Sequence, residues 1–206
     1  MLLKNFLEIF SNYKSHIIKI IFYEIIYIIM GHKGNQFDFS KNMKMTANIP
    51  CPYYFLVKIK QRLKENNFNT FVDFGCGSGR VIYFFNKSFK NKKFIGIDYF
   101  EDHCNTCKKI FENNKNIKII QSDFTKLNFS SFEGDCFFFN DPIKNEKDSI
   151  DFIKKILSSN VSKRGVLLIF INCNKNLFKL MGKAKCVDSY YINNIKGYSI
   201  YHLDKR

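Results

Sequence analysis

Residues 72–80 read VDFGCGSGR, a glycine-rich turn between a short apolar run and a predicted helix. Glycine accepts positive φ angles and has no Cβ, so such a turn lets a ligand approach the main chain closely. The helix that follows offers unpaired N–H groups in its first turn. Arg80 stands where the dinucleotide pattern G-x-G-x-x-G needs its third glycine. No Gly-Lys-Ser/Thr follows, which also excludes a phosphate-binding P-loop.

The segments around this turn alternate between strands and helices. Short apolar runs predict strands at 71–74, 94–97, 117–120, 136–139 and 166–171. Helices are predicted at 53–65, 80–89, 102–113 and 149–157. Two further strands, 184–192 and 198–203, flank a turn and read as a hairpin on the sheet edge. This order predicts a doubly wound, mostly parallel, seven-stranded α/β sheet with a C-terminal antiparallel hairpin, a Rossmann-like fold.

The chain has 206 residues, enough for one such domain and a short extension. We expect residues 1–49 to form an N-terminal helical extension and a connector, and residues 50–206 to form the ligand-binding domain. The extension includes the apolar run 16–30, which is shorter than a membrane span and contains Lys19 and Glu24. It also lacks a signal-peptide cleavage site. Two interpretations stay open, a helix packed on the domain, which we favour, and a helix lying in a membrane interface.

Carboxylates follow the second and third predicted strands. Asp98 closes the run 94–97, where it is placed to accept hydrogen bonds from ribose hydroxyls. Asp123 follows the run 117–120, where it is placed to accept from an adenine amino group with Phe124 beside the ring. A single aspartate at such a position is often only a helix cap or turn residue. Together with Asp73 and the glycine turn, however, these carboxylates predict a nucleoside-binding edge.

The order VDFGCGSGR, then IGID, then QSDF resembles class I S-adenosylmethionine-dependent methyltransferases. The likeness covers about residues 50–203 and implies S-adenosylmethionine as the cofactor. It places Asp73, Gly75 and Gly77 along the methionine part, Asp98 at the ribose and Asp123 at the adenine. The full set of cofactor-binding residues that we predict is Asp73, Gly75, Cys76, Gly77, Gly79, Asp98, Tyr99, Asp123 and Phe124.

A closer likeness, to bacterial methyltransferases with unassigned substrates, rests on residues 49–54 (IPCPYY) and 137–143 (FFFNDPI). Asn140, Asp141 and Pro142 are the predicted catalytic residues, because this turn resembles the [D/N]-P-P-[F/Y] turn of amine methyltransferases. Ile143 replaces the second proline, and the stacking aromatic is missing. Asp141 is a candidate general base, or else a turn residue before proline. Tyr53 and Tyr54 either border the substrate pocket or pack at the start of a helix.

The composition is strongly basic, with 33 Lys and Arg against 18 Asp and Glu and a net charge of +15. Nucleic acid is a possible partner, but only four of the basic residues are arginines and they form no cluster, so we do not favour it. An odd number of cysteines, seven, indicates reduced thiols and a cytoplasmic protein. Cys104 and Cys107 lack a second ligand pair at zinc spacing, and we expect both to face the core.

The sequence therefore predicts a methyltransferase acting on a small molecule, a sugar or a protein side chain. An RNA methyltransferase, favoured only by charge, is the first alternative. A non-catalytic partner protein with a cofactor fold is the second, although the glycine turn and Asp98 are both intact.

Overall fold

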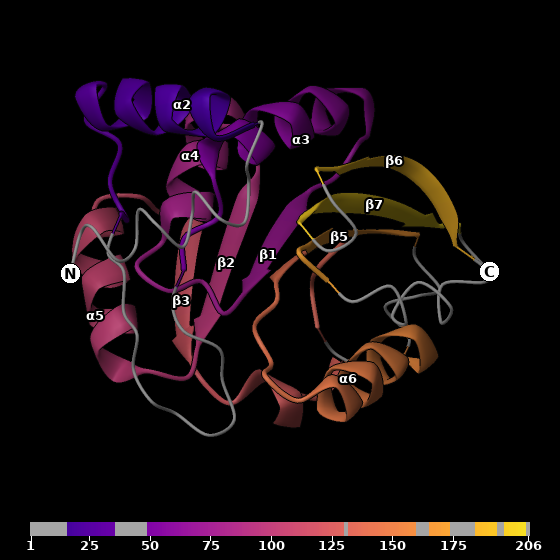
Figure 1. Ribbon diagram of the computed structural model, residues 1–206. Helices are drawn as coiled ribbons and strands as arrows, with labels where there is room; N and C mark the ends of the chain where they lie inside the picture. Colours follow the sequence, from indigo (N-terminus) through magenta and orange to yellow (C-terminus); the bar gives the residue numbers. More distant parts are fainter. Residues whose placement is uncertain are drawn as a thin grey trace.

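The computed structural model describes residues 16–35, 49–129, 132–159, 165–173, 184–192 and 196–204. Its centre is a seven-stranded sheet in the order β3-β2-β1-β4-β5-β7-β6. The strands that run parallel are β1 (Thr70–Phe74), β2 (Lys93–Asp98), β3 (Ile117–Gln121), β4 (Cys136–Asn140) and β5 (Val166–Ile171). The antiparallel hairpin of β6 (Lys185–Tyr191) and β7 (Gly197–Leu203) pairs with β5 through β7. The predicted fold class is confirmed (Figure 1).

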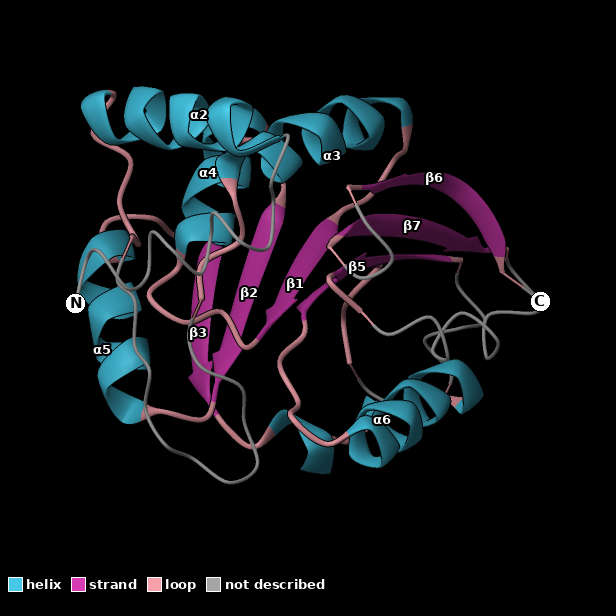
Figure 2. Cartoon of the chain, viewed as in Figure 1, coloured by secondary structure: helices cyan, strands magenta, loops and turns pink. Residues whose placement is uncertain are grey.

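Helices cover both faces of the sheet, but unequally (Figure 2). One face carries α3 (Tyr53–Glu65), α4 (Arg80–Ser88) and α5 (Glu101–Phe111), with α2 (Ile17–Ile29) packed outside α3 and α4. On the other face, the described helices are α6 (Glu146–Ser158) and the short 3₁₀ helix η2 (Phe124–Lys126). The strand pattern sorts the aromatic residues, because successive side chains point to opposite faces. Thus Phe71 packs under α4, whereas Phe74 packs against α6.

The predicted elements agree with the structure to within a few residues. The helix at 53–65 and the strand at 166–171 have the predicted bounds. The largest difference is the start of α6, at Glu146 instead of Ser149, because the Asn145 side chain accepts from the N–H groups of Lys147 and Asp148 and caps the helix earlier. Of the predicted helical extension and connector at 1–49, residues 1–15 and 36–48 lie outside the described ranges. Within those ranges, no helix is both long and apolar enough to cross a membrane.

Candidate active site

The glycine turn follows the carboxyl end of β1, and its backbone conformation favours glycine. Gly75, Gly77 and Gly79 have φ angles of 76°, 51° and 89°, all in the left-handed region. A Cβ on Gly75 would lie 2.8 Å from the Cβ of Pro142, so the turn touches the segment that follows β4. The backbone N–H groups of Gly75 and Cys76 bond to the carbonyl of Ile97 on β2. The turn is thereby fixed between the ends of three neighbouring strands.

Asp98, at the end of β2, is part of the support of this turn. Its Oδ2 accepts the Gly77 N–H at 2.8 Å, and its Oδ1 accepts the Phe100 N–H at 2.9 Å. The Nδ1 atom of His103 lies 3.2 Å from the same Oδ1. A carboxylate offers about four acceptor positions, so three bonds leave about one for a ribose hydroxyl. The ribose role stays a prediction, and His103, which the sequence analysis missed, joins the site from the first turns of α5.

Asp73 is the most unusual group at this edge. It is 1% exposed, and its Oδ2 has no hydrogen-bond partner in the described part of the chain. Burial raises the pKa of this carboxyl well above its ordinary value, and the nearby Asp98 carboxylate raises it further. A buried oxygen without a partner costs free energy until a donor arrives. Asp73 is therefore ready to receive a cationic or N–H-bearing ligand at the glycine turn.

This environment predicts a pH dependence of stability. The folded protein holds the Asp73 proton more tightly than the unfolded chain does, so the free energy of unfolding falls as pH rises from the ordinary value of 3.8 towards the raised pKa. Asp73→Asn carries no charge in either state and should remove this contribution. Urea unfolding of both proteins across pH 4–8 measures it. The same slope in both proteins would contradict the assignment, and Asp151→Asn on the surface of α6 is the control.

The two predicted site residues that follow β3, Asp123 and Phe124, differ in their environment. Asp123 caps η2, because its Oδ1 accepts from both the N–H and the hydroxyl of Thr125. Burial raises its pKa, but these bonds together with Lys126 outweigh burial and lower it. The Phe124 ring is 1% exposed and packs against Phe74 and Phe152. The prediction that this ring lies beside the adenine is therefore wrong, since the short helix turns it into the core. A contact between Asp123 and adenine stays a prediction.

Tyr99 differs from these residues because its side chain is open to solvent. It directly follows Asp98, is 45% exposed, and meets Phe100 edge to face at 5.5 Å between ring centroids. An exposed aromatic ring beside the end of β2 provides a flat apolar surface for a nucleobase. Of the two aromatic residues predicted to contact the cofactor, Tyr99 and Phe124, Tyr99 is the one whose side chain is exposed enough to do so.

The three predicted catalytic residues lie at the turn after β4, which touches the glycine turn through Pro142. The Nδ2 of Asn140 donates to the carbonyl of Ile49 at 2.8 Å, so this amide holds the chain that enters α3. Asp141 has a φ of 45°, a left-handed conformation that aspartate tolerates better than most residues. Although this residue is exposed, desolvation of the carboxyl raises its pKa, and Lys196 opposes that shift. Pro142 packs against Gly75.

Tyr53 and Tyr54 are packing residues, the second of the two interpretations given above. Tyr53 is fully buried, and its ring stacks on Tyr27 of α2 at 4.6 Å between centroids. Tyr54 is 8% exposed, and its hydroxyl lies 3.0 Å from that of Tyr190 on β6. A substrate-pocket role for either side chain is therefore wrong for the described structure. The reason is that α2 and β6, far away in the sequence, close over the start of α3.

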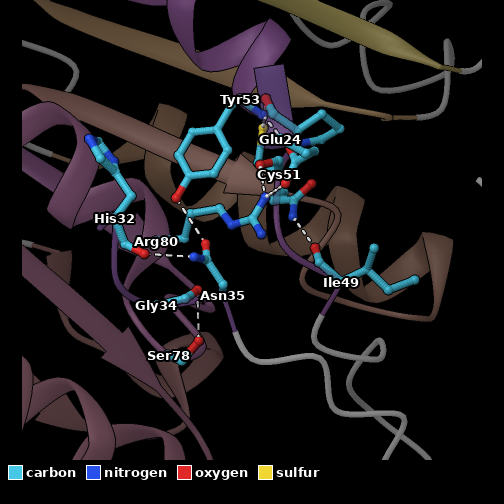
Figure 3. A network of polar contacts seen from close by, with 11 residues as sticks. Glu24, His32, Gly34, Asn35, Ile49, Cys51, Tyr53, Ser78 and Arg80 are labelled. Atoms are coloured by element: carbon cyan, nitrogen blue, oxygen red, sulfur yellow. Dashed lines mark hydrogen bonds and ion pairs between the residues drawn. The ribbon is translucent and has the colours of Figure 1, made fainter. Parts of the chain in front are cut away.

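The N-terminal extension reaches the glycine turn through a buried ion pair (Figure 3). Arg80, the first residue of α4, is 4% exposed and donates to Glu24 of α2 at 2.8 Å. Its guanidinium lies over the Tyr53 ring, 4.5 Å from the centroid, and also donates to the carbonyl of Cys51. The other oxygen of Glu24 accepts the N–H of Tyr53 and so caps α3. One carboxylate thus joins α2, α3 and α4.

Residues 31–35 continue this contact directly onto the turn. Ser78 donates its hydroxyl to the carbonyl of Gly34 at 2.9 Å, and Asn35 accepts from the Tyr53 hydroxyl at 2.8 Å (Figure 3). A Cβ on Gly34 would lie only 2.4 Å from the backbone N of Arg80, and its φ is 81°. The extension therefore packs on the glycine turn at backbone distance. Packing of this extension on the domain is the interpretation favoured from the sequence, but its contact with the glycine turn is a feature that no sequence pattern indicates.

Two thiols lie beneath the turn. Cys104 and Cys107 are fully buried on the core side of α5, as predicted. The Sγ of Cys107 donates to the carbonyl of Gly77 at 3.1 Å. The neighbouring Cys76 is also buried; its hydrogen bond with Cys107 and its burial raise its pKa well above the ordinary value. These cysteines support the turn from beneath, and Cys76 offers the cofactor backbone contacts more readily than its side chain.

Comparisons with known proteins agree with this geometry. Residues 71–159 match the family model described as a methyltransferase domain. No curated protein matches the chain. Among solved structures, a putative caffeoyl-CoA O-methyltransferase from Staphylococcus aureus has a TM-score of 0.59 at 13% identity, covering 90% of this chain and 92% of that one.

Two further structures have the same fold. An N-methyltransferase, NodS, from Bradyrhizobium japonicum WM9, solved with S-adenosyl-L-homocysteine, has a TM-score of 0.56 at 10% identity over 73% of this chain and 84% of that one. A SAM-dependent methyltransferase from Aquifex aeolicus has a TM-score of 0.52 at 14% identity over 75% of this chain and all of that one. At such identities, these structures establish the fold.

Proposed function

We propose that this chain, which carries a class I S-adenosylmethionine-dependent methyltransferase domain, methylates a small molecule, a sugar or a protein side chain. The match of residues 71–159 and the sheet order support the domain assignment. The acceptor class is our inference from the turn after β4.

The residues at the glycine turn fit S-adenosylmethionine. When bound, this cofactor supplies a methyl group on a sulfonium, together with the ammonium and carboxylate of its methionine part. The partnerless Oδ2 of Asp73 suits an ammonium, and the glycine turn leaves the main chain open to close approach. Asp98 has acceptor capacity left for a ribose hydroxyl, and Tyr99 offers a flat surface. The buried Oδ2 of Asp73 is the observation that carries the assignment, since a donor such as an ammonium would give it the partner that it lacks in the described part of the chain.

The chain contributes to methyl transfer by positioning and by proton removal. A nucleophile must lie in line with the methyl–sulfur bond at about 3–3.5 Å, so the close contact between Pro142 and Gly75 is what brings the turn after β4 into range. Asp141 accepts the acceptor's proton in this proposal, and its raised pKa makes the carboxylate a stronger base than an ordinary aspartate. Asn140 is already bonded to the Ile49 carbonyl and holds the chain in place.

The residues of the turn after β4 do not favour a nucleobase as the methyl acceptor. Lys144, which is exposed, occupies the position where a stacking aromatic would be needed. Ile143, which replaces the second proline, is 5% exposed and packed in the core beneath α6. Stacking on aromatic side chains contributes much of the binding of an unpaired base. A hydroxyl or amine on a small molecule, sugar or protein side chain needs no such platform.

Labelled cofactor tests the acceptor class. We expect cell extract incubated with the protein and methyl-labelled S-adenosylmethionine to show label in the small-molecule or protein fraction after separation from RNA. Label confined to RNA would overturn the acceptor class while leaving the methyltransferase assignment intact. Failure of the protein to bind S-adenosyl-L-homocysteine in calorimetry would overturn both.

Once an acceptor fraction is known, Asp141→Asn tests the base. We expect the rate of label transfer to fall about 100-fold, the lower end of what a general base contributes. Cofactor affinity should stay unchanged, because the proposed role concerns the acceptor's proton. Asp151→Asn on the surface of α6 is the matched control. A rate within twofold of the wild type would reject the role of Asp141.

A further inference from the structure

Among the described residues, the outward face of α2 is apolar and largely exposed. Ile18, Phe22, Ile25 and Ile29 repeat at spacings of four, three and four residues, which places them on one side of the helix. They are 78%, 60%, 52% and 79% exposed. The opposite side of α2, with Ile17, Ile20, Glu24 and Tyr27, packs on α3 and α4. A monomeric protein rarely leaves such a contiguous apolar stripe in water without a partner for it.

The charges around this stripe are positive. Glu24 is the one acidic residue in the described range 16–35, and it points inward to Arg80. Lys19 and Lys33 are exposed near the two ends of α2. Lys60 and Lys87 lie near the C-terminal end of α2, close enough to His32 for their charges to lower its pKa. Burial is the main cause of this shift, which brings the His32 pKa to about 4. Within the described residues, none of these four lysines forms an ion pair.

We propose that the outward face of α2 docks on an anionic lipid surface. The four apolar side chains would enter the boundary between headgroups and acyl chains, and the flanking lysines would meet the lipid phosphates. The helix has 13 residues and is about 20 Å long, so it lies along the surface. A second copy of this chain is the less suitable occupant, since it would bring the same lysines together. Figure 1 shows α2 on the outside of the helical layer, where a flat surface can reach it.

Vesicle flotation tests this proposal with the full chain. The probes are vesicles of phosphatidylcholine alone and of phosphatidylcholine with 30% phosphatidylserine. We expect the protein to float with the phosphatidylserine vesicles, and less so as salt rises. Lys19→Gln with Lys33→Gln should weaken partitioning about thirtyfold, as expected for two lysines near such a surface. Lys108→Gln with Lys109→Gln, on the exposed side of α5, has the same net charge as the Lys19 and Lys33 variant. It should nevertheless float like the wild type.

A second pair of variants tests the apolar side chains. Phe22→Gln with Ile25→Gln should abolish flotation without lowering the unfolding midpoint, because both side chains are largely exposed. Ile49→Gln removes an apolar side chain of 46% exposure elsewhere and serves as the control. No flotation of the wild type, or equal flotation of all variants, would overturn the proposal. A concentration-dependent dimer that the Phe22 and Ile25 pair abolishes would assign the face to a second copy and overturn it too.

Discussion

Replacing Gly77 with valine is expected to weaken binding of S-adenosyl-L-homocysteine at least a hundredfold, or about 2.7 kcal/mol. Gly77 has a φ of 51°, and its N–H bonds to Asp98 at 2.8 Å. A β-branched residue is strained at positive φ, so the turn would have to change its backbone course. That change separates the turn from Asp98 and places a side chain where a ligand approaches the backbone. Isothermal titration calorimetry measures the loss.

Gly31→Val is the matched control for this substitution. Gly31 also has a positive φ, 69°, but a Cβ there would meet nothing within 4 Å. It should therefore share the backbone strain and the loss of stability while it retains cofactor affinity. Equal affinity of the Gly77 variant and the wild type would remove the glycine turn from the cofactor site. Equal losses in both variants would attribute the effect to general destabilisation.

Removing the carboxylate of Glu24 should destabilise the protein by about 3 kcal/mol, the low end of the range for breaking a buried ion pair. Arg80 would stay 4% exposed without its counter-ion, and the N–H of Tyr53 would lose its acceptor at the start of α3. The low end applies because the Glu24 side chain keeps 24% exposure. Urea unfolding of Glu24→Ala measures the loss. Glu65→Ala, whose pair with Arg62 is open to solvent, is the control and should have much less effect.

A double-mutant cycle separates the pair from its surroundings. Arg80→Met keeps much of the length of the side chain without the charge, so adding it to Glu24→Ala removes the unpaired cation. We expect the double variant to be more stable than Glu24→Ala alone. Strict additivity of the two single changes would show that the ion pair contributes nothing specific. Since Arg80 follows the glycine turn directly, Glu24→Ala should also reduce cofactor affinity.

Features that depend on neighbouring residues could be predicted from the sequence, whereas features that depend on distant contacts could not. Strand and helix positions followed from apolar periodicity, because burial of one face is encoded in consecutive residues. The start of α6 moved by three residues since a cap, Asn145, acts before the apolar pattern begins. The prediction for Phe124 is wrong for a similar reason. Asp123 caps a 3₁₀ helix that turns Phe124 into the core, and no apolar periodicity indicates this helix.

The sheet, the glycine turn and the alignment of carboxylates at the strand ends could all be predicted from the order of the residues. These features depend on spacing along the chain and on the rule that parallel strands end at one edge. The folded arrangement of the chain, by contrast, is what pairs Glu24 with Arg80, packs Gly34 on the turn, and buries Tyr53 and Tyr54. It also decided which side of α2 stays open. Each of these contacts joins residues that are far apart in the sequence, where no apolar periodicity relates one to the other. They depend on how the extension and β6 pack on the rest of the domain.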